Sequence, residues 1–306
     1  MTQSHYYAKA SARNVLSHIR QWLCFTIFFG LCFLPARTED IIPFLELMAL
    51  SSGYDHIKAV LGSIGFLHKN LGLSFPADSF QIKITLQALK RRLARAPNQA
   101  LPIAPEHLLK MYKFIDISNP QDLALWCAFL VGFFGLLRKK SICPEDPSDV
   151  DPVKILTVRK VSVDRGKGVA LLYINFSKTI QFGQRDLIIP HVSNNCKNLL
   201  LSQTKASPDS PAFSYRTKSG SVSFITHKLF TSRLKALLSK AGYSPEKFSG
   251  HSLRRGAATF LYNCGSSQLE IQACGDWQSQ IFTRYLFVSL DRRFSSQKLM
   301  ASNLPQ

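Results

Sequence analysis

The chain has 306 residues, of which 46% are hydrophobic and 19% are charged, so its composition excludes a largely disordered protein. Lysine and arginine outnumber aspartate and glutamate by 38 to 19, which gives a net charge of +19 and favours a polyanionic partner, most simply nucleic acid. Residues 151–306 hold 22 basic and 8 acidic side chains, against 16 and 11 in residues 1–150. A basic surface that serves only solubility is the alternative interpretation of this excess.

The cysteines and the apolar runs exclude further classes of protein. Seven cysteines are an odd number and include no Cys-x-x-Cys pair, which argues against a disulfide framework or a zinc site and indicates a reducing compartment. The two longest apolar runs, 22–34 and 123–137, fall short of the about 20 residues that a membrane helix needs. We interpret both as core helices.

Residues 1–96 are expected to form an all-helical domain, with helices over 6–33, 41–50, 56–71 and 78–95. The last of these helices ends in a cluster of four cations, Lys90, Arg91, Arg92 and Arg95. Such charge can compensate a helix dipole, but four cations in six residues exceed what capping needs and predict a phosphate-facing surface. Residues 97–105 contain three prolines and are predicted to be a linker.

A second domain is expected over residues 106–306. Pro105 suits the first turn of a short helix that ends at Phe114. Asn119 and Pro120 begin a longer helix, which is apolar over 123–137 and is predicted to end at three cations, Arg138, Lys139 and Lys140.

The period of the apolar residues changes after this helix. Segments 155–164, 168–179 and 180–190 are rich in β-formers and separated by turn residues, which predicts a small antiparallel sheet. Residues 206–223 are rich in Ser, Pro and Gly and are expected to be a loop. Further helices are expected at 225–243, 252–264, 267–274 and 278–290, with room for a short one at 294–301.

Four motifs occur in a characteristic order along the second domain: FFGLLRKKS, FSKTIQFG, GHSLRRGAAT and GDWQSQIFTRYL. In this order the chain resembles the tyrosine recombinase (phage integrase) superfamily. The residues of the motifs more closely resemble the crypton and DIRS-like recombinases of eukaryotic mobile elements. The resemblance implies a mostly α fold with a small antiparallel β-sheet. It also implies an N-terminal helical core-binding (SAM-like) domain over 1–96, the linker at 97–105 and an α+β catalytic domain over 106–306.

The resemblance implies that Tyr285 is the nucleophile, which attacks a DNA phosphate and leaves a 3′-phosphotyrosyl bond. Arg138 and Arg254 are then expected to hold the non-bridging phosphate oxygens, because guanidinium groups grip two oxygens and stay charged throughout. The alternatives are a core tyrosine at 285 and a helix C-cap at 138. The His-x-x-Arg spacing selects Arg254 and leaves Arg255 as a DNA-backbone or surface charge.

Three further residues complete the expected site. His251 is expected to donate to the phosphate or to relay the tyrosine's proton, and a structural histidine is the alternative. Trp277 can only donate, so we assign it to phosphate support or to the pocket wall; a packing anchor is compatible with either. Lys178 matches the hairpin lysine that protonates the departing 5′ oxygen, with Lys167 as its competitor. The chain departs from many relatives by carrying no acidic residue just after Arg138.

The predicted function is site-specific recombination or integration of double-stranded DNA, for a mobile element in the nucleus. The arginines supply the electrostatics of phosphoryl transfer, so we expect no metal and no other cofactor. We further expect a homo-oligomer, a tetramer on DNA, with no membrane and no small-molecule substrate. The alternatives are a non-catalytic DNA-binding protein derived from a recombinase, a type IB topoisomerase and an unrelated basic scaffold.

Overall fold

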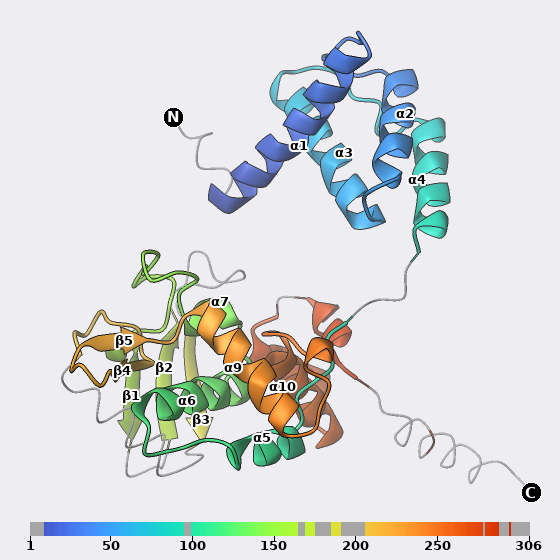
Figure 1. The fold of residues 1–306 in the computed structure, drawn as a ribbon. Coiled ribbons are helices and arrows are strands. Elements are labelled where there is room, and N and C mark those ends of the chain that lie inside the picture. Colours follow the sequence, from blue (N-terminus) through green and yellow to red (C-terminus); the bar gives the residue numbers. More distant parts are fainter. Residues whose placement is uncertain are drawn as a thin grey trace, which may run out of the picture. The chain divides into compact units, whose positions relative to one another are not determined.

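The computed structural model describes residues 9–94, 99–164, 169–174, 185–190, 206–277, 279–287 and 294 (Figure 1). It divides the chain into two compact units, an N-terminal unit, Met1–Asn98, and a C-terminal unit, Gln99–Gln306. Each unit has its own hydrophobic core. Among the described residues, no helix combines the length and the apolar character that crossing a membrane requires.

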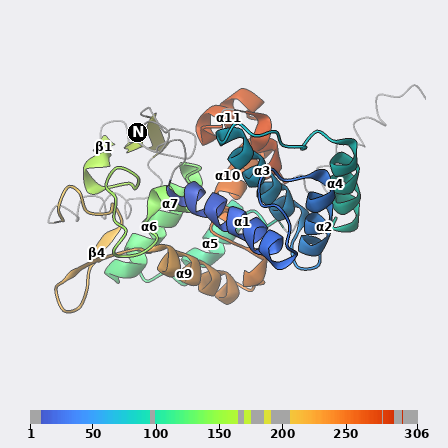
Figure 2. The ribbon, with the colours of Figure 1, turned by 90° about the horizontal axis from the view of Figure 1, so that it is seen from above.

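The described part of the N-terminal unit contains four helices: α1 (Lys9–Phe28), α2 (Thr38–Ala49), α3 (Tyr54–Asn70) and α4 (Phe80–Arg92). Helix α1 packs along α3, and α2 packs along α4 (Figure 2). The expected end of the last helix at residue 95 is wrong, because α4 ends at Arg92 and Leu93 is its C-cap. Arg95 lies outside the described residues.

The core of the N-terminal unit is closed by polar groups that find partners in the backbone. Trp22 is fully buried, and its indole N–H donates to the carbonyl of Phe33 at 3.0 Å. His68 is also fully buried; its Nε2 accepts from the amide of Ala36 at 2.8 Å, and its Nδ1 lies 2.8 Å from the carbonyl of Ile64. Two of these bonds reach the segment between α1 and α2 and hold it against the core. Breaking them would leave a buried polar group unpaired, which is costly.

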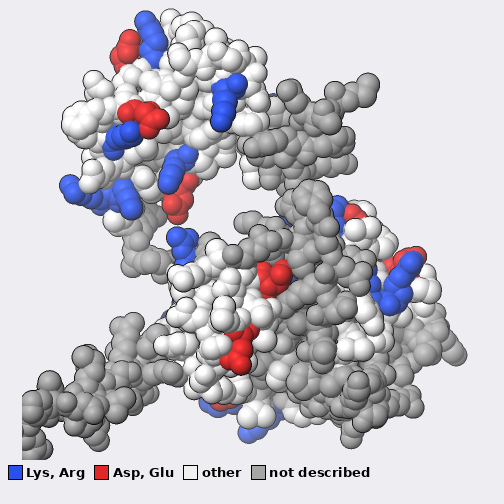
Figure 3. Space-filling model, turned by 180° about the vertical axis from the view of Figure 1, so that it is seen from behind, with Lys and Arg blue, Asp and Glu red and all other residues white. Residues whose placement is uncertain are grey.

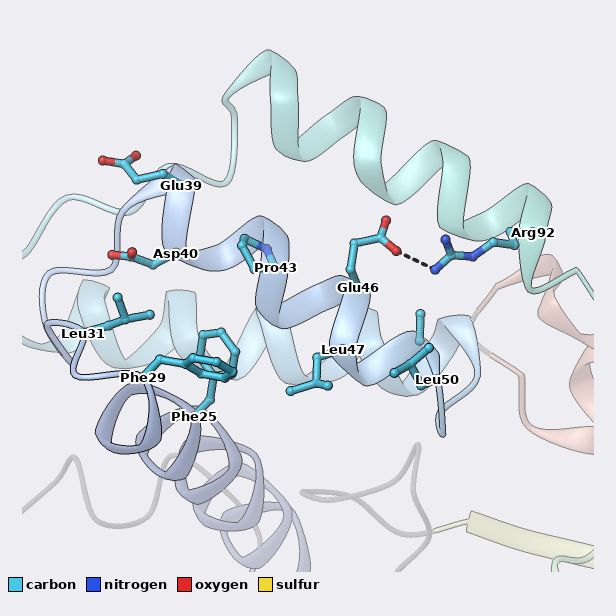
Figure 4. A pocket seen from close by; sticks show the side chains of 11 residues that line it. Phe25, Phe29, Leu31, Glu39, Asp40, Pro43, Glu46, Leu47, Leu50 and Arg92 are labelled. Atoms are coloured by element: carbon cyan, nitrogen blue, oxygen red, sulfur yellow. Dashed lines mark hydrogen bonds and ion pairs between the residues drawn. The ribbon is translucent and has the colours of Figure 1, made fainter.

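An apolar groove of about 880 Å³ opens between the end of α1 and the face of α2 (Figure 4). Phe25, Phe29 and Leu47 are among the side chains that line it. At its rim, Arg92 of α4 donates to Glu46 at 2.6 Å. The ion pair therefore engages one of the cations that the sequence assigned to a phosphate-facing surface.

The C-terminal unit is built around α6 (Pro120–Phe134), whose residues are buried along most of its length. Asn119 caps the helix by accepting from the amides at 121 and 122, and Pro120 occupies its first turn, where a missing N–H is harmless. Helix α6 contacts α7 (Lys139–Ile142), α10 (Ser252–Asn263) and strands of both small sheets (Figure 1).

The sheets of the C-terminal unit confirm the antiparallel prediction and correct its details. Strands β1 (Val161–Asp164), β2 (Val169–Ile174) and β3 (Arg185–Pro190) form one antiparallel sheet in sequence order. Residues 155–160 are not part of it: Ile155 and Leu156 enter the core, and a short 3-10 helix precedes β1. The segment expected to be a loop at 206–223 contains β4 (Ser214–Arg216) and the start of β5 (Val222–Phe224), which pair as a hairpin.

Other helices of the described part of this unit pack around the core. They are α5 (Pro105–Tyr112), α9 (His227–Lys240) and α11 (Gln268–Gly275), with short 3-10 helices η2 (Val158–Lys160), η4 (Pro245–Lys247) and η5 (Gln280–Tyr285). The helix expected at 278–290 is wrong in type and length, since η5 is a 3-10 helix of six residues. Of the short helix expected at 294–301, all but the first residue lies outside the described residues.

Candidate active site

The first arginine of the expected site follows an unusual end of α6. The helix stops at Phe134, earlier than predicted, because Leu136 adopts a left-handed conformation with φ of 47°. A leucine pays a steric penalty there, which a glycine would avoid. Half-buried Arg138 then stands at the N-cap position of α7 rather than in the last turn of α6. The structure therefore removes the helix C-cap as an explanation of this arginine.

Arg254 joins three elements of the C-terminal unit. It lies on α10, is only 2% exposed, and donates from Nη1 to the carbonyl of Leu136 and from Nη2 to the carbonyl of Gly275 at 2.6 Å. Both carbonyls lie at turns that contain a residue in the left-handed conformation. After α6 this residue is Leu136 itself, and after α11 it is Asp276, with φ of 53°. One guanidinium thus fixes the ends of α6 and α11 relative to α10.

Trp277 and Tyr285 lie against the same guanidinium. The guanidinium carbon of Arg254 is 4.1 Å from the Trp277 ring centre and 5.6 Å from the Tyr285 ring centre. The two rings are 5.2 Å apart, at an angle of 56°. Trp277 is 4% exposed, and its buried indole N–H has no hydrogen-bond partner among the described residues. Such an orphaned donor in a site is a candidate ligand contact.

The Gly-Asp-Trp motif has a packing explanation. A side chain at position 275 would collide with the indole of Trp277, so only glycine lets the ring fold back over the end of α11. Asp276 takes the left-handed conformation that ends the helix, a position where Asp is tolerated better than most residues. The motif therefore places Trp277 against Arg254.

Sequence reasoning missed the residue that holds the segment of Tyr285. Thr259 is buried on α10; its hydroxyl donates to the carbonyl of Tyr285 at 3.3 Å and accepts from the amide of Phe287 at 3.1 Å. Thr259 thus anchors the C-terminal end of η5 to the helix that carries Arg254. The only sequence signal is its place as the last residue of the motif GHSLRRGAAT, which does not reveal these contacts.

His251 stands at the N-cap of α10 in a strongly positive environment. Its pKa is lowered from the ordinary value, first by loss of hydration around the ring and then by the charges of Arg254, Arg138 and Lys139. The imidazole is therefore mostly neutral at pH 7 while no anion is bound. A neutral imidazole can accept a proton at one nitrogen and donate at the other.

Arg255 has a contact within the protein. Its Nη1 donates to the carbonyl of Ala100 at 2.9 Å, and burial lowers its pKa. Beside it, the absence of a side chain at Gly256 lets α10 approach the backbone of Ile103, whose amide donates to the carbonyl of Ser252 at 2.9 Å. These contacts fix the residues before α5 to the site helix, so a DNA contact of Arg255 stays a prediction.

Other predicted residues are not part of this cluster. Lys178 and its competitor Lys167 lie outside the described residues, as does Arg95. Lys90 and Arg91 are exposed at the end of α4. On the face shown in Figure 3, basic side chains of the N-terminal unit are scattered, with acidic ones beside some of them. The structure thus brings Arg254, Trp277 and Tyr285 together. His251 stands at the start of the helix that carries Arg254, where the charges of Arg254 and Arg138 lower its pKa.

The comparisons with known proteins find recombinases and integrases. No protein-family model matches the chain. Recombinase cre of Escherichia phage P1 is 23% identical over 289 residues, which cover 89% of this chain and 81% of the phage protein. The match therefore includes both units.

Solved structures resemble the chain in fold at low identity. A XerH site-specific recombinase, bound to its palindromic difH substrate, matches with a TM-score of 0.60 and 14% identity over 94% of this chain and 78% of its own. The Tn1549 transposon integrase in complex with transposon right end DNA gives 0.60 and 13% over 97% and 95%. A lambda integrase dimer bound to a COC′ core site gives 0.54 and 16% over 93% and 90%. These likenesses confirm the predicted fold class. Together with the similarity to the phage recombinase, they agree with the resemblance stated from the motifs.

Proposed function

We propose that this protein is a site-specific DNA recombinase of the tyrosine recombinase superfamily, which cleaves and rejoins DNA strands through a bond between Tyr285 and a DNA phosphate. The observation that carries the proposal is the cluster of Arg254, Trp277 and Tyr285, within 4.1 to 5.6 Å of one another. A phenol, a buried guanidinium and an unpartnered indole N–H are groups that a phosphoryl transfer through tyrosine needs.

In the proposed reaction, the phenolic oxygen of Tyr285 attacks the scissile phosphorus. The bond from phosphorus to the 5′ oxygen breaks, which leaves a 3′-phosphotyrosyl bond and a 5′ hydroxyl. Attack of a 5′ hydroxyl from the partner strand reverses these steps and rejoins the DNA. One phosphodiester is exchanged for another, so the reaction needs no nucleotide cofactor.

Arg254 is prepared for the charge of the transition state before DNA binds. Two of its N–H groups are donated to the carbonyls of Leu136 and Gly275, which fixes the plane of the guanidinium. Donors that are fixed in advance stabilise developing charge without reorganisation. Arg138 at the start of α7 would supply the second guanidinium, and the indole N–H of Trp277 a neutral donor.

His251 would accept the proton of the Tyr285 phenol. Loss of hydration and then the surrounding cations lower the pKa of the imidazole, so its neutral form has a free nitrogen at pH 7. Lys178 would donate a proton to the leaving 5′ oxygen, as the resemblance implies. A neutral histidine and a charged lysine divide the acid and base tasks by their ordinary chemistry.

Double-stranded DNA is the proposed substrate. The net charge of +19 supports a polyanionic partner, and the similar Tn1549 integrase was solved in complex with transposon right end DNA. We further propose that the protein acts as a tetramer on DNA, serves the integration of a mobile element and works in the nucleus. The resemblance to eukaryotic mobile-element recombinases supports the last two proposals.

A suicide substrate tests the enzyme directly. A nicked duplex that loses its 5′ fragment after cleavage traps the covalent adduct, which denaturing electrophoresis detects. Candidate duplexes come from the DNA that flanks the open reading frame. We expect an adduct with the native protein and with Tyr262→Phe, a matched tyrosine on α10, and none with Tyr285→Phe. DNA binding without an adduct in the native protein would favour the non-catalytic DNA-binding alternative.

A further inference from the structure

Lys139 is a cation beside the site to which the sequence assigned no part in catalysis or DNA binding. It is the first residue of α7, directly after Arg138, and is half-buried. Its aliphatic stem lies against Gly250: a Cβ at that position would stand 3.0 Å from Cδ and 3.5 Å from Cε of the lysine. The stem therefore packs on the backbone directly before His251, and it fits there because residue 250 has no side chain.

The ammonium group of Lys139 is held by a hydroxyl of α9. Its Nζ donates to Oγ1 of Thr231 at 3.1 Å, and that hydroxyl donates in turn to the carbonyl of His227 at 2.8 Å. The hydroxyl hydrogen is thus directed away from the ammonium, and a lone pair is directed toward it. Helices α7, α9 and α10 meet at this point (Figures 1 and 2).

Lys139 differs from its neighbour Lys140 in its electrostatic partners. Lys140 is exposed and lies 3.4 Å from Glu145, whereas no carboxylate within 4.0 Å pairs with Lys139 among the described residues. Arg138 likewise has no such ion pair in that part of the chain. Adjacent cations repel each other without a counter-ion, and a bound anion removes that cost. The arrangement therefore suits a phosphate better than an internal salt bridge.

We propose that Lys139 is a DNA-phosphate-binding residue of the candidate site, whose stem also holds the turn at Gly250 and His251 in place. The proposal rests on the proposed function for the identity of the anion. Lys139 is a cation at a position, after the first arginine, where many members of the resembled family carry small or acidic residues. The ammonium has three donors, and Thr231 takes one of them.

The test is the salt dependence of DNA binding, measured for Lys139→Met and for Lys140→Met as the matched control. Methionine keeps most of the stem and removes the charge. Loss of one phosphate contact should reduce the slope of log affinity against log salt by about 0.9. We expect this reduction for Lys139→Met, little change for Lys140→Met, and restoration of the slope by Lys139→Arg.

Thr231→Val separates phosphate binding from a purely structural role. It removes the hydroxyl and keeps the shape, so it breaks the only internal hydrogen bond of the Lys139 ammonium that the structure describes. If Lys139 only braces the fold, both Lys139→Met and Thr231→Val lower the melting temperature and leave the salt slope at the native value. That result would overturn the proposal. If Lys139 binds phosphate, Thr231→Val keeps the native slope and Lys139→Met does not.

Adduct formation distinguishes this proposal from the proposed function. For an active native protein, Lys139→Met should lower the rate of adduct formation by roughly tenfold, the effect of one charge-assisted hydrogen bond. If the native protein forms no adduct but Lys139→Met still reduces the salt slope, the recombinase proposal fails and phosphate binding by Lys139 stands. If the native protein forms the adduct and Lys139→Met matches it in rate and slope, only the Lys139 proposal fails.

Discussion

The two units differ in whether the indole N–H of a buried tryptophan has a hydrogen-bond partner. Trp22 in the N-terminal unit and Trp277 in the C-terminal unit are both almost fully buried. The indole N–H of Trp22 donates to the carbonyl of Phe33, whereas that of Trp277 has no partner in the described part of the chain. Since buried donors are nearly always satisfied, the contrast separates a finished core from a site that is completed by a ligand.

The backbone repeats the same contrast. The two non-glycine residues with positive φ in the described part of the chain, Leu136 and Asp276, both lie in the C-terminal unit. Arg254 donates to the carbonyl of Leu136 and to the carbonyl directly before Asp276. Residues in sparsely populated conformations persist where their surroundings determine them, and they gather at functional sites. In the described part of the chain, the C-terminal unit therefore carries backbone strain beside Arg254, and the N-terminal unit has no such non-glycine residue.

Arg254→Met should produce the largest effect, because it removes both hydrogen bonds that join the ends of α6 and α11. Each bond from a charged donor is worth roughly 1.5–3 kcal/mol, so we expect the free energy of unfolding to fall by about 3 kcal/mol or more. Adduct formation should be lost. Urea denaturation and the suicide substrate measure the two effects, and native stability in the variant would contradict the structural role of Arg254.

Trp22→Phe and Trp277→Phe compare the units directly, because the two substitutions remove the same atoms from buried rings. Trp22→Phe also leaves the Phe33 carbonyl without its donor, so we expect it to cost about 1 kcal/mol more stability than Trp277→Phe. Trp277→Phe should instead slow adduct formation by roughly tenfold or more, through the lost donor. Equal losses of stability, with unchanged adduct formation, would show that Trp277 is only a packing anchor.

The contrast between the units also explains which parts of the structure could be predicted. Apolar periodicity and caps such as Asn119 and Pro120 located most helices to within a few residues, because these signals are local. The early end of α6 could not be predicted, since the left-handed Leu136 is accompanied by a hydrogen bond from Arg254, 118 residues away. The hairpin of β4 and β5 was missed because its Ser and Gly content resembles a loop, while its pairing depends on the core beside Phe213.

The candidate site was predictable in its residue types but not in its supports. The order of the motifs selected His251, Arg254, Trp277 and Tyr285, and the structure brings the last three together. Thr259 and Lys139 lie within two of the motifs but were assigned no role there, because their contacts to Tyr285 and Gly250 exist only in the folded chain. The helix predicted around Tyr285 failed for a related reason: η5 ends where Thr259 binds the chain on both sides of residue 286.

Acidification should destabilise the C-terminal unit more than the N-terminal unit, by less than the Arg254 substitution does. Burial is the first cause that lowers the pKa of His107, His227 and His251 in the C-terminal unit, and of His18 in the N-terminal unit. An unfolded histidine, with its ordinary pKa near 6.5, binds protons more readily than these folded ones. The stability is therefore fully present above about pH 6.5 and is lost as the pH falls below it.

Urea denaturation at pH 7.5 and pH 5.5, followed by limited proteolysis, measures this effect, because each unit yields its own fragments. We expect the C-terminal unit to become protease-sensitive at lower urea at pH 5.5, with a smaller change in the N-terminal unit. An equal shift in both units would show that general charge repulsion, rather than these histidines, sets the pH dependence.

Asp276 gives the smallest effect and the narrowest test of the strained backbone. Asp276→Ala and Asp276→Gly both remove the carboxylate, so whatever that group contacts is lost equally in the two variants. They differ in the left-handed conformation, with φ of 53°, which alanine resists and glycine adopts freely. We expect the glycine variant to be more stable by about 1 kcal/mol in urea denaturation. If the alanine variant is equally stable, then the turn before Trp277 relaxes when Asp276 is replaced, and Arg254 alone must hold the end of α11 in place.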